Sequence, residues 1–379
     1  MNKPRIRFKG FEGEWKERRI GDICNVSTGK SNTQDKVDDG KFPFYVRSPH
    51  IEKSNKYLYD EEAVLTVGDG VGTGKVFHYV NGKYDLHQRV YRLYDFKGVN
   101  ALCFYYYFSQ KFYKRVMAMT AKSSVDSVRL DFISEMHLPF PSLPEQRAIA
   151  SYFTSLDAQI AASTSRLSSL KQIKAASLLN MFPQKGETVP RVRFKGFQGE
   201  WKERKLGEIA IVNPKCDLPK SFEYVDLESV VGTEMKSHRR EFRESAPSRA
   251  QRLARKGDIF YQTVRPYQKN NYLFNLDYSD YVFSSGYAQI QALKDERFLF
   301  TVVQSDYFLK QVMDNCTGTS FPSINPTLLR NLIVYDCSID EQRAIGQYLT
   351  ALDAQITLHR ERLEILKQIK AACHEKMFA

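Results

Sequence analysis

Glycine-rich loops are the first residues in this chain whose spacing suggests a chemistry, namely phosphate binding. Residues 68–76 (GDGVGTGKV) resemble a phosphate-binding loop, which requires the pattern GxxxxGK followed by Ser or Thr. Asp69 stands where the first glycine is needed, and Val76 stands where the magnesium-binding hydroxyl is needed. Residues 27–31 (STGKS) fail in the same way, because Cys24 replaces the first glycine. We therefore predict a glycine-rich hairpin tip at 68–76.

Catalytic and metal-binding patterns are incomplete as well. An amino-methyltransferase grips its base with Asn or Asp, two prolines and an aromatic ring, whereas 213–215 (NPK) and 325–327 (NPT) lack the second proline and the ring. GxSxG and HExxH patterns are missing too. The six cysteines form no CxxC pair, which indicates free thiols of a reducing cytosol. We predict a binding protein with no catalytic residue, no metal site and no cofactor of its own.

Length and charge indicate the kind of partner. The chain of 379 residues is long enough for two to three domains. Its formal net charge is +12, and two long repeated segments described below carry only +3 of it. The excess positive charge therefore lies in the rest of the chain, which favours a polyanionic partner such as nucleic acid. No apolar run reaches the ~18 residues that span a bilayer, so we expect a cytoplasmic protein without membrane contact.

Two internal repeats organise the chain. Residues 145–182 return as 341–378 with 23 of 38 positions identical. Residues 4–23, here called the first arm, return as the second arm, 190–209, with 15 of 20 positions identical. The order of arm, insert and long helical segment thus occurs twice. Each arm turns at glycines and presents one tryptophan, so we expect it to dock against the neighbouring helix or to touch phosphate.

The long repeated segments have the apolar spacing of paired helices. Apolar residues recur at alternating steps of four and three, which is the seam of a coiled coil. Ser142 with Glu145, and Ser338 with Glu341, fit a capping box at the helix start. We expect the two helices to pack as an antiparallel pair related by a pseudo-twofold axis. The predicted seam residues are Ile149, Phe153, Leu156, Ile160, Leu167, Leu170, Ile345, Leu349, Leu352, Ile356, Leu363 and Leu366.

The two inserts share an order of elements but few residues. Each reads as short strands bounded by Gly, Asn and Asp, then a helical stretch, then a closing segment before the long helix. Strand-like runs lie at 42–46, 63–67, 75–80, 87–94, 221–230, 257–274 and 281–293, and helical stretches at 101–119 and 297–313. The predicted fold class is α+β, with two β-rich domains and two long helices. The predicted boundaries are 1–143, 144–183, 184–339 and 340–379.

Side chains at turns of the inserts are the candidates for DNA contact. Base edges are read by hydrogen bonds, while phosphate contacts supply affinity and orientation. Residues 236–256 carry eight basic and two acidic residues, which fits either a phosphate-facing patch or a solvated loop with an amphipathic helix. The candidates are Arg47, His50, Lys75 and Arg89 in the first insert, and Arg239, Arg240, Arg265, Tyr267, Lys269 and Asn270 in the second.

These features together resemble a known family, the DNA specificity (S) subunits of type I restriction–modification systems. The resemblance rests on the double occurrence of EQRAI…LKQIKAA and of RFKGFxGEWKER, and it covers nearly the whole chain. It implies that each insert is a target recognition domain for one half of a split site in double-stranded DNA. It also implies that the helices set the spacer and dock two methyltransferase (M) subunits, and that restriction–translocase (R) subunits join. S-adenosylmethionine, ATP and Mg²⁺ would then belong to those partners.

Three other readings remain. A self-contained methyltransferase or nuclease would act on DNA without partners, which we do not expect of this chain. A coiled-coil scaffold would bridge proteins and would show no salt-dependent binding to duplex DNA. A stand-alone DNA-binding regulator would bind DNA without a methyltransferase. The recognised bases and the spacer length do not follow from the sequence, because side-chain-to-base correspondence depends on docking angle and DNA shape.

Overall fold

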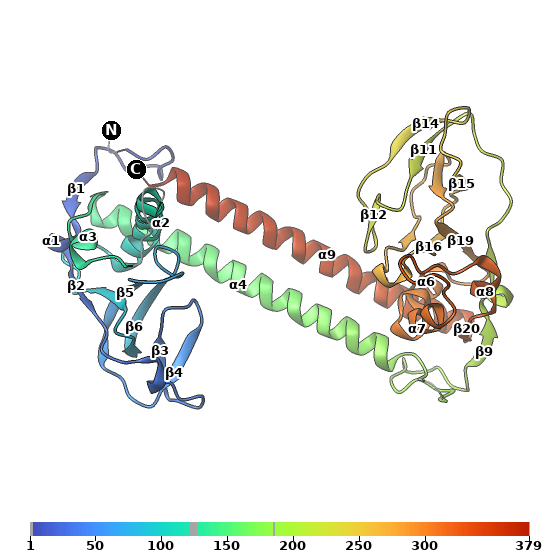
Figure 1. The fold of residues 1–379 in the computed structure, drawn as a ribbon, viewed down its shortest axis with the longest axis horizontal. Coiled ribbons are helices and arrows are strands. Elements are labelled where there is room, and N and C mark those ends of the chain that lie inside the picture. The colour runs from blue at the N-terminus through green and yellow to red at the C-terminus, as the bar shows by residue number, and fades with distance from the viewer. Residues whose placement is uncertain (1–2, 121–126, 185, 379) are drawn as a thin grey trace. The chain divides into compact units, whose positions relative to one another are not determined.

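The computed structural model describes residues 3–120, 127–184 and 186–378, and the chain divides into two compact units. Unit 1 comprises 1–165 and 361–379, and unit 2 comprises 166–360. Each unit therefore contains one insert together with parts of both long helices, α4 (Leu143–Asn180) and α9 (Ile339–Lys376), drawn green and red in Figure 1. The predicted boundaries treat each long helix as a separate segment of the chain. Packing instead places one part of each long helix in unit 1 and the rest in unit 2. No helix among the described residues is long and apolar enough to cross a membrane.

Unit 1 is built on a six-stranded sheet in the order β2-β7-β5-β6-β3-β4. Its ladders are antiparallel except for the parallel pair β3–β6. The second half of β5, residues 63–67, is buried throughout, as expected for a central strand covered on both faces. The strands are β2 (Asn25–Thr28), β3 (Phe42–Tyr45), β4 (Ile51–Ser54), β5 (Tyr59–Val67), β6 (Phe77–Leu86) and β7 (Val90–Tyr94).

The predicted helical stretch of the first insert is confirmed as α2 (Ala101–Thr120). Asn100 caps it, since its side-chain oxygen accepts the N–H of Cys103 at 2.9 Å. Phe104, Phe108 and Phe112 recur every four residues and so share one face of the helix. Their rings stack at centroid distances of 5.1 and 4.8 Å within the main core of unit 1. Burial of this aromatic face fixes α2 to the sheet.

Unit 2 contains two four-stranded sheets, ordered β10-β19-β16-β17 and β14-β11-β18-β15, and a short hairpin, β12–β13. Its strands are β10 (Ala210–Val212), β11 (Ser221–Val225), β12 (Val230–Val231), β13 (Glu234–Met235), β14 (Arg239–Phe242), β15 (Ala250–Leu253), β16 (Ile259–Gln262), β17 (Tyr272–Leu273), β18 (Tyr281–Ser284) and β19 (Tyr287–Ala292). The pair β11–β18 is parallel, like β3–β6 in unit 1.

The pairings show that both inserts have one topology. In unit 1, β5 pairs with β6 along its length and with β7 through its second half. In unit 2, β15 pairs with β18, while β16 pairs with β17 and β19. Thus β15 and β16 together take the place of β5, and β17 and β18 take the place of β6. The predicted common order of elements is confirmed, and the broken strands give unit 2 additional loops.

The second helical stretch is two helices rather than one. The predicted helical stretch over 297–313 is confirmed, but it is interrupted at Ser305, between α6 (Glu296–Gln304) and α7 (Asp306–Asp314). The Ser305 hydroxyl accepts the N–H of Phe308 at 3.2 Å, an N-cap bond that starts the second helix. Serine competes with the backbone for such bonds, which explains the break.

The arms pair with the closing segments of the inserts, a contact that the sequence did not suggest. In unit 1, β1 (Lys16–Arg19) pairs with β8 (His137–Phe140), and in unit 2, β9 (Lys202–Lys205) pairs with β20 (Ile333–Asp336). Trp15 and Trp201 are each only 2% exposed. Short helices complete this frame: α1 (Ile20–Ile23), α3 (Leu130–Ser134), α5 (Leu206–Ile209), α8 (Pro326–Asn331), and the 3₁₀ turns η1 (Thr33–Asp35) and η2 (Pro266–Gln268).

The glutamate predicted to complete each capping box has another role. Both carboxylate oxygens of Glu145 accept hydrogen bonds from Arg7 of the first arm at 2.7 Å, and Glu341 binds Arg193 in the same way at 2.6 and 2.7 Å. The glutamates are buried, so each bidentate pair offsets the cost of a buried charge. The capping-box prediction is confirmed in part at α9, where the Ser338 hydroxyl accepts the Glu341 N–H at 3.3 Å. The glutamate side chains, however, hold the arms against the helix starts.

In each unit, α4 and α9 run antiparallel. In unit 1, Asp157 pairs with Lys370, and Tyr152 lies 3.4 Å from the Cys373 sulfur. In unit 2, Lys174 pairs with Asp353, and the Ser177 hydroxyl lies 3.3 Å from that of Tyr348. Residue numbers rise on one helix as they fall on the other, which confirms the predicted antiparallel pairing. Nine of the twelve seam residues are buried, and Ile160, Leu167 and Ile356 are half-buried.

Met-Phe follows each long helix, and each Phe enters the core of a unit. Phe378 stacks on Tyr107 at 4.7 Å and on Phe153 at 5.6 Å in unit 1. Phe182 lies 5.9 Å from Trp201 and 5.7 Å from Phe298 in unit 2. The repeated sequence therefore anchors the end of one helix beside the start of the other in each unit.

His374 is expected to make the stability of unit 1 sensitive to acid. Burial lowers the pKa of this ring, although its Nε2 hydrogen-bonds the Tyr106 carbonyl at 2.6 Å. Because the unfolded chain binds the proton more readily, stability is expected to fall as the pH drops below about 6.5. Leu178 holds the equivalent position of the other repeat. His374→Leu is therefore expected to reduce the loss of urea stability between about pH 7.5 and about pH 5.5. An unchanged loss would contradict this role.

Candidate nucleic-acid interface

Three loops of unit 1 meet at one end of its sheet: 46–50 after β3, 68–76 between β5 and β6, and 87–89 between β6 and β7. The Gly68 N–H donates to the Arg89 carbonyl at 2.9 Å, and the His87 N–H donates to the Tyr45 carbonyl at 3.0 Å. A Cβ on Gly72 would lie 2.6 Å from the Arg47 carbonyl oxygen, so the loops approach as closely as glycine allows. The predicted glycine-rich hairpin tip is confirmed here.

The predicted residues of the first insert lie on these loops. Arg47, His50, Lys75 and Arg89 are all exposed. Arg47 and Arg89 flank Asp69, with nitrogen–oxygen distances of 3.5 and 3.6 Å. Burial lowers the pKa of the neighbouring His87, and the charges of Arg47 and Arg89 lower it further against an opposing effect of Asp69. The sequence did not single out Asp69, Gln88 or Arg129, which line a pocket of about 320 Å³ beside Arg89.

The same end of unit 2 carries the equivalent loops. Val264 and Ser323 form an isolated bridge, as Asp69 and Ser127 do in unit 1. Next to it, the Ile324 N–H donates to the Thr263 carbonyl at 3.1 Å, matching the bond of 2.7 Å from Val128 to Gly68. The loop after β16, residues 263–271, therefore corresponds to the glycine-rich loop of unit 1. The bridges and backbone hydrogen bonds that hold the two loops are equivalent, whereas the side chains of the loops differ.

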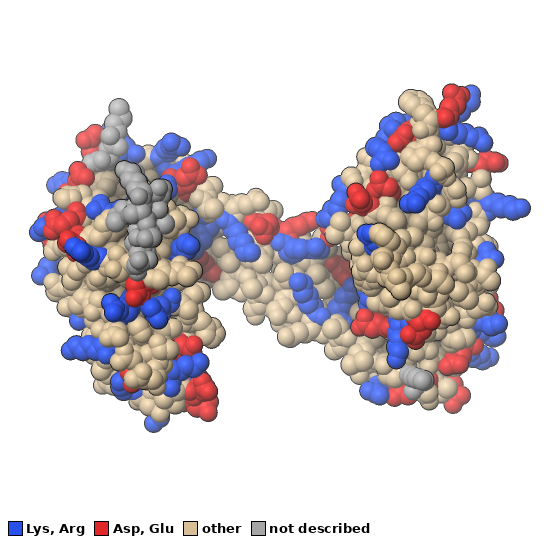
Figure 2. Space-filling view, in the orientation of Figure 1, with Lys and Arg blue, Asp and Glu red and all other residues tan. Residues whose placement is uncertain are grey.

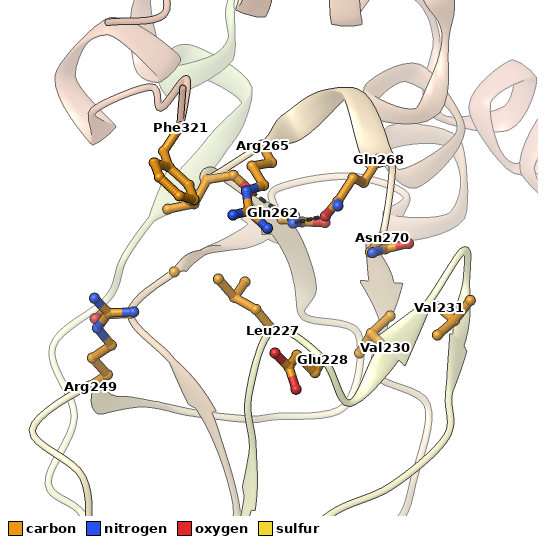
Figure 3. Close-up of a pocket in the computed structure, with 13 residues that line it drawn as sticks. Leu227, Glu228, Val230, Val231, Arg249, Gln262, Arg265, Gln268, Asn270 and Phe321 are labelled. Carbon is orange, nitrogen blue, oxygen red and sulfur yellow. Dashed lines mark hydrogen bonds between the residues drawn. The ribbon is translucent and has the colours of Figure 1, made fainter. Parts of the chain in front are cut away.

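A pocket of about 810 Å³ opens among these loops in unit 2 (Figure 3). Arg265 and Asn270, both predicted, line it, and the Asn270 side-chain oxygen accepts the Gly232 N–H at 2.8 Å. Buried Gln262 donates to the Val264 carbonyl at 2.7 Å and to the Gln268 side-chain oxygen at 2.8 Å. This orients Gln268 so that its amide nitrogen remains a donor for a ligand.

Two other predicted residues lie on the same loop but do not line this pocket. Tyr267 is half-exposed on η2. The Lys269 ammonium donates to the Gln304 carbonyl at 3.0 Å and to Asp306 at 2.6 Å. Lys269 therefore ties the loop to the α6–α7 junction, which is a structural contact the sequence did not suggest.

Arg239 and Arg240 lie on β14, and carboxylates partly compensate their charge. Arg239 pairs with Asp226 at 2.7 Å and Glu241 at 2.8 Å. Arg240 pairs with Glu223 at 3.0 Å and Asp280 at 2.8 Å. A hydrogen bond from His238 lowers the pKa of Glu223, and Arg240 lowers it further against the effect of burial. On the face of unit 2 shown in Figure 2, basic and acidic side chains are interspersed.

The basic stretch 236–256 contains no helix. It forms β14, a turn and β15, so the alternative of an amphipathic helix is corrected. Its contribution to the pocket is Arg249, which the sequence did not single out, and Glu228, Gln262, Gln268 and Phe321 were also missed. For Gln262 and Gln268 the signal is position, because they lie at or beside the loop 263–271, which corresponds to the glycine-rich loop of unit 1. Among the described residues, no group of three or more His, Cys, Asp or Glu could hold a metal ion.

Comparison with known proteins decides the family. The family model described as the type I restriction modification DNA specificity domain matches residues 12–172 and again 198–368. The chain belongs to this family. The specificity subunit is 22% identical over 370 residues to the type I restriction enzyme EcoDI specificity subunit of Escherichia coli, covering 90% of this chain and 82% of the relative. It is 24% identical over 417 residues to the MjaVIII specificity subunit of Methanocaldococcus jannaschii, covering 96% and 93%.

A solved structure supports the fold of the specificity subunit. The type I restriction–modification S subunit from M. genitalium aligns with a TM-score of 0.71 at 15% identity, covering 100% of this chain and 99% of that one. The α+β fold with two repeated specificity domains is therefore confirmed. As a member of this family, the chain is a non-catalytic specificity subunit for DNA target recognition, and such subunits work in type I restriction–modification complexes with other subunits and DNA.

Proposed function

We propose that each unit of this specificity subunit reads one half of a bipartite site in double-stranded DNA. The observation that carries the proposal is the correspondence of the loops: residues 68–76 in unit 1 and 263–271 in unit 2 are held by an equivalent bridge and an equivalent backbone hydrogen bond. The backbone bonds of these loops match, but their exposed side chains do not. Two domains with the same backbone arrangement and different exposed side chains can dock on DNA in the same way and read different bases.

We further propose that α4 and α9 set the number of base pairs between the half-sites and dock two methyltransferase subunits. The repeat of helix and arm in the sequence gives each unit an equivalent surface, which favours two copies of one partner. S-adenosylmethionine would be held by the methyltransferase subunits, and ATP and Mg²⁺ by restriction–translocase subunits. Because the substrate is chromosomal DNA, we place the assembled complex in the cytoplasm.

Arg89→Ala tests the reading role of unit 1. In the complex with the methyltransferase partner, the variant is expected to lose base preference in one half-site only, by about 1–3 kcal/mol per contacted base pair. The measurement is sequencing of methylated adenines on a library with both half-sites randomised. Lys97→Ala is a matched control, because Lys97 is equally exposed and follows β7 at its other end. Altered preference in both halves, or in neither, would contradict the proposal.

A further inference from the structure

Arg265 differs from the other cations predicted in unit 2. Arg239, Arg240 and Lys269 are each bound to carboxylates. Arg265, by contrast, takes part in no ion pair and no side-chain hydrogen bond within 3–120, 127–184 and 186–378. Its guanidinium lies over the ring of Phe321, 4.3 Å from the centroid. Stacking covers one face of the guanidinium and leaves its N–H donors, which lie in the plane, directed outward.

The backbone of Arg265 is held in an uncommon conformation. Its φ and ψ are 54° and 53°, in the left-handed region that side chains other than glycine rarely adopt. The Arg265 N–H donates to the Pro322 carbonyl at 2.8 Å, and its own carbonyl accepts the Gln268 N–H at 3.1 Å. Pro266 follows and begins η2 with a fixed φ. These constraints aim a long side chain from a rigid loop and reduce the entropy lost on binding.

The surroundings of Arg265 suit a base edge better than a phosphate. Figure 3 shows Arg265, Gln268 and Asn270 along one rim of the pocket, with Phe321 beside Arg265. Side-chain amides bind base edges, most often adenine, and an arginine fork matches O6 and N7 of guanine. Phe321 is 59% exposed, and an exposed ring there offers an apolar contact that a phosphate does not use. Glu228 also lines the pocket and would repel a phosphate.

We propose that Arg265 is a specificity-determining residue that reads a guanine in the half-site of unit 2, with Phe321 orienting its guanidinium. This rests on the proposed reading role of the unit. Bidentate donation to the guanine O6 and N7 makes the preference specific, since in the major groove adenine presents a donor in place of O6. Arg265 is the reading residue, and Phe321 is a positioning residue.

The test uses the assembled complex with its methyltransferase subunits and the randomised library described above. Arg265→Ala and Arg265→Lys are expected to reduce preference for guanine at one position of one half-site by roughly 10- to 100-fold. Lysine can still donate to guanine O6 and N7 but lacks the planar fork, so a base reader shows a loss confined to one position. A phosphate contact is instead largely rescued by lysine and affects all sequences alike. Phe321→Ala is expected to weaken the preference for guanine at the same position, and Phe321→Tyr is expected to retain that preference. Lys294→Ala is the control, because Lys294 is paired with Asp336 at 2.8 Å and follows β19 at its other end.

The outcomes separate the inference from the proposed function. A uniform fall in methylation across all sequences, rescued by lysine, would show a phosphate contact and overturn the inference while the two half-sites persist. An unchanged guanine preference would also overturn it. A wild-type complex that selects no bipartite site would instead overturn the proposed function on which the inference rests.

Discussion

Phe153→Ala is expected to destabilise unit 1 by about 3–5 kcal/mol, because truncating a buried aromatic ring leaves a cavity in a close-packed core. Phe153 is fully buried and stacks on Tyr106 at 4.9 Å and on Phe378 at 5.6 Å. These rings come from an insert helix and both long helices, so one truncation loosens all three. Lysine at Phe153 or Leu352 is expected to cost more, since it buries a charge without a partner.

The two tryptophans allow each unit to be followed separately. Trp15 is buried in unit 1 and Trp201 in unit 2, so Trp201→Phe leaves a fluorescence signal from unit 1 alone. In that background, urea unfolding is expected to show the full loss of unfolding free energy of unit 1 for Phe153→Ala. Phe153→Leu, which copies Leu349 of the other repeat, is expected to cost only about 1 kcal/mol. A shift in the unit 2 transition, read with Trp15→Phe, without one in unit 1 would contradict the packing.

Lengthening both long helices by seven residues is expected to change the recognised DNA site without changing its half-sites. The insertions belong between Ser165 and Arg166 and between Arg360 and Glu361, where the units meet along each helix. All contacts within each unit are then preserved, including the pairs Asp157–Lys370 and Lys174–Asp353. Seven residues at ~1.5 Å rise add ~10 Å. At ~3.4 Å per base pair the spacer would grow by up to about three base pairs.

Mapping of methylated adenines measures the result directly. The matched control is the same insertion in α4 alone, which cannot keep the antiparallel contacts of both units and is expected to abolish methylation. If the double insertion altered the half-site bases and left the spacer unchanged, the helices would not set the spacing. If it left the whole site unchanged, the proposed spacer role would fail as well.

Local patterns predicted the repeated scaffold well. The 4–3 spacing of apolar residues depends only on neighbours along one helix, so the two helices and their seam could be read from the chain. Strand runs such as 63–67 and 281–293 were evident for the same reason, although β18 and β19 within the second run belong to different sheets. The break at Ser305 was missed because a single serine cap competes weakly with a strong helical pattern.

Ion pairs between residues that are far apart in the chain could not be predicted from the sequence. Arg7 meets Glu145 across 138 positions, and Arg193 meets Glu341 across 148, so a capping box seemed the nearer role for these glutamates. Arg240 finds Asp280 across 40 positions, and Lys269 finds Asp306 across 37. Electrostatic pairing depends on distance in space, which a linear pattern does not contain. The charge count alone could not separate Arg265 from its paired neighbours.

The sequence by itself determined the twofold repeat, the α+β class, the long antiparallel helices and the family, because self-similarity and periodicity are properties of the chain. The tertiary structure alone decided which loops converge, because strands β3, β5 and β6 bring together residues that are far apart in sequence. It also decided where the strands of unit 2 are broken relative to those of unit 1, since hydrogen-bonded register follows from backbone pairing. Arg265 remains available for a ligand because of this folding, whereas Lys269, four residues later, is bound to the α6–α7 junction.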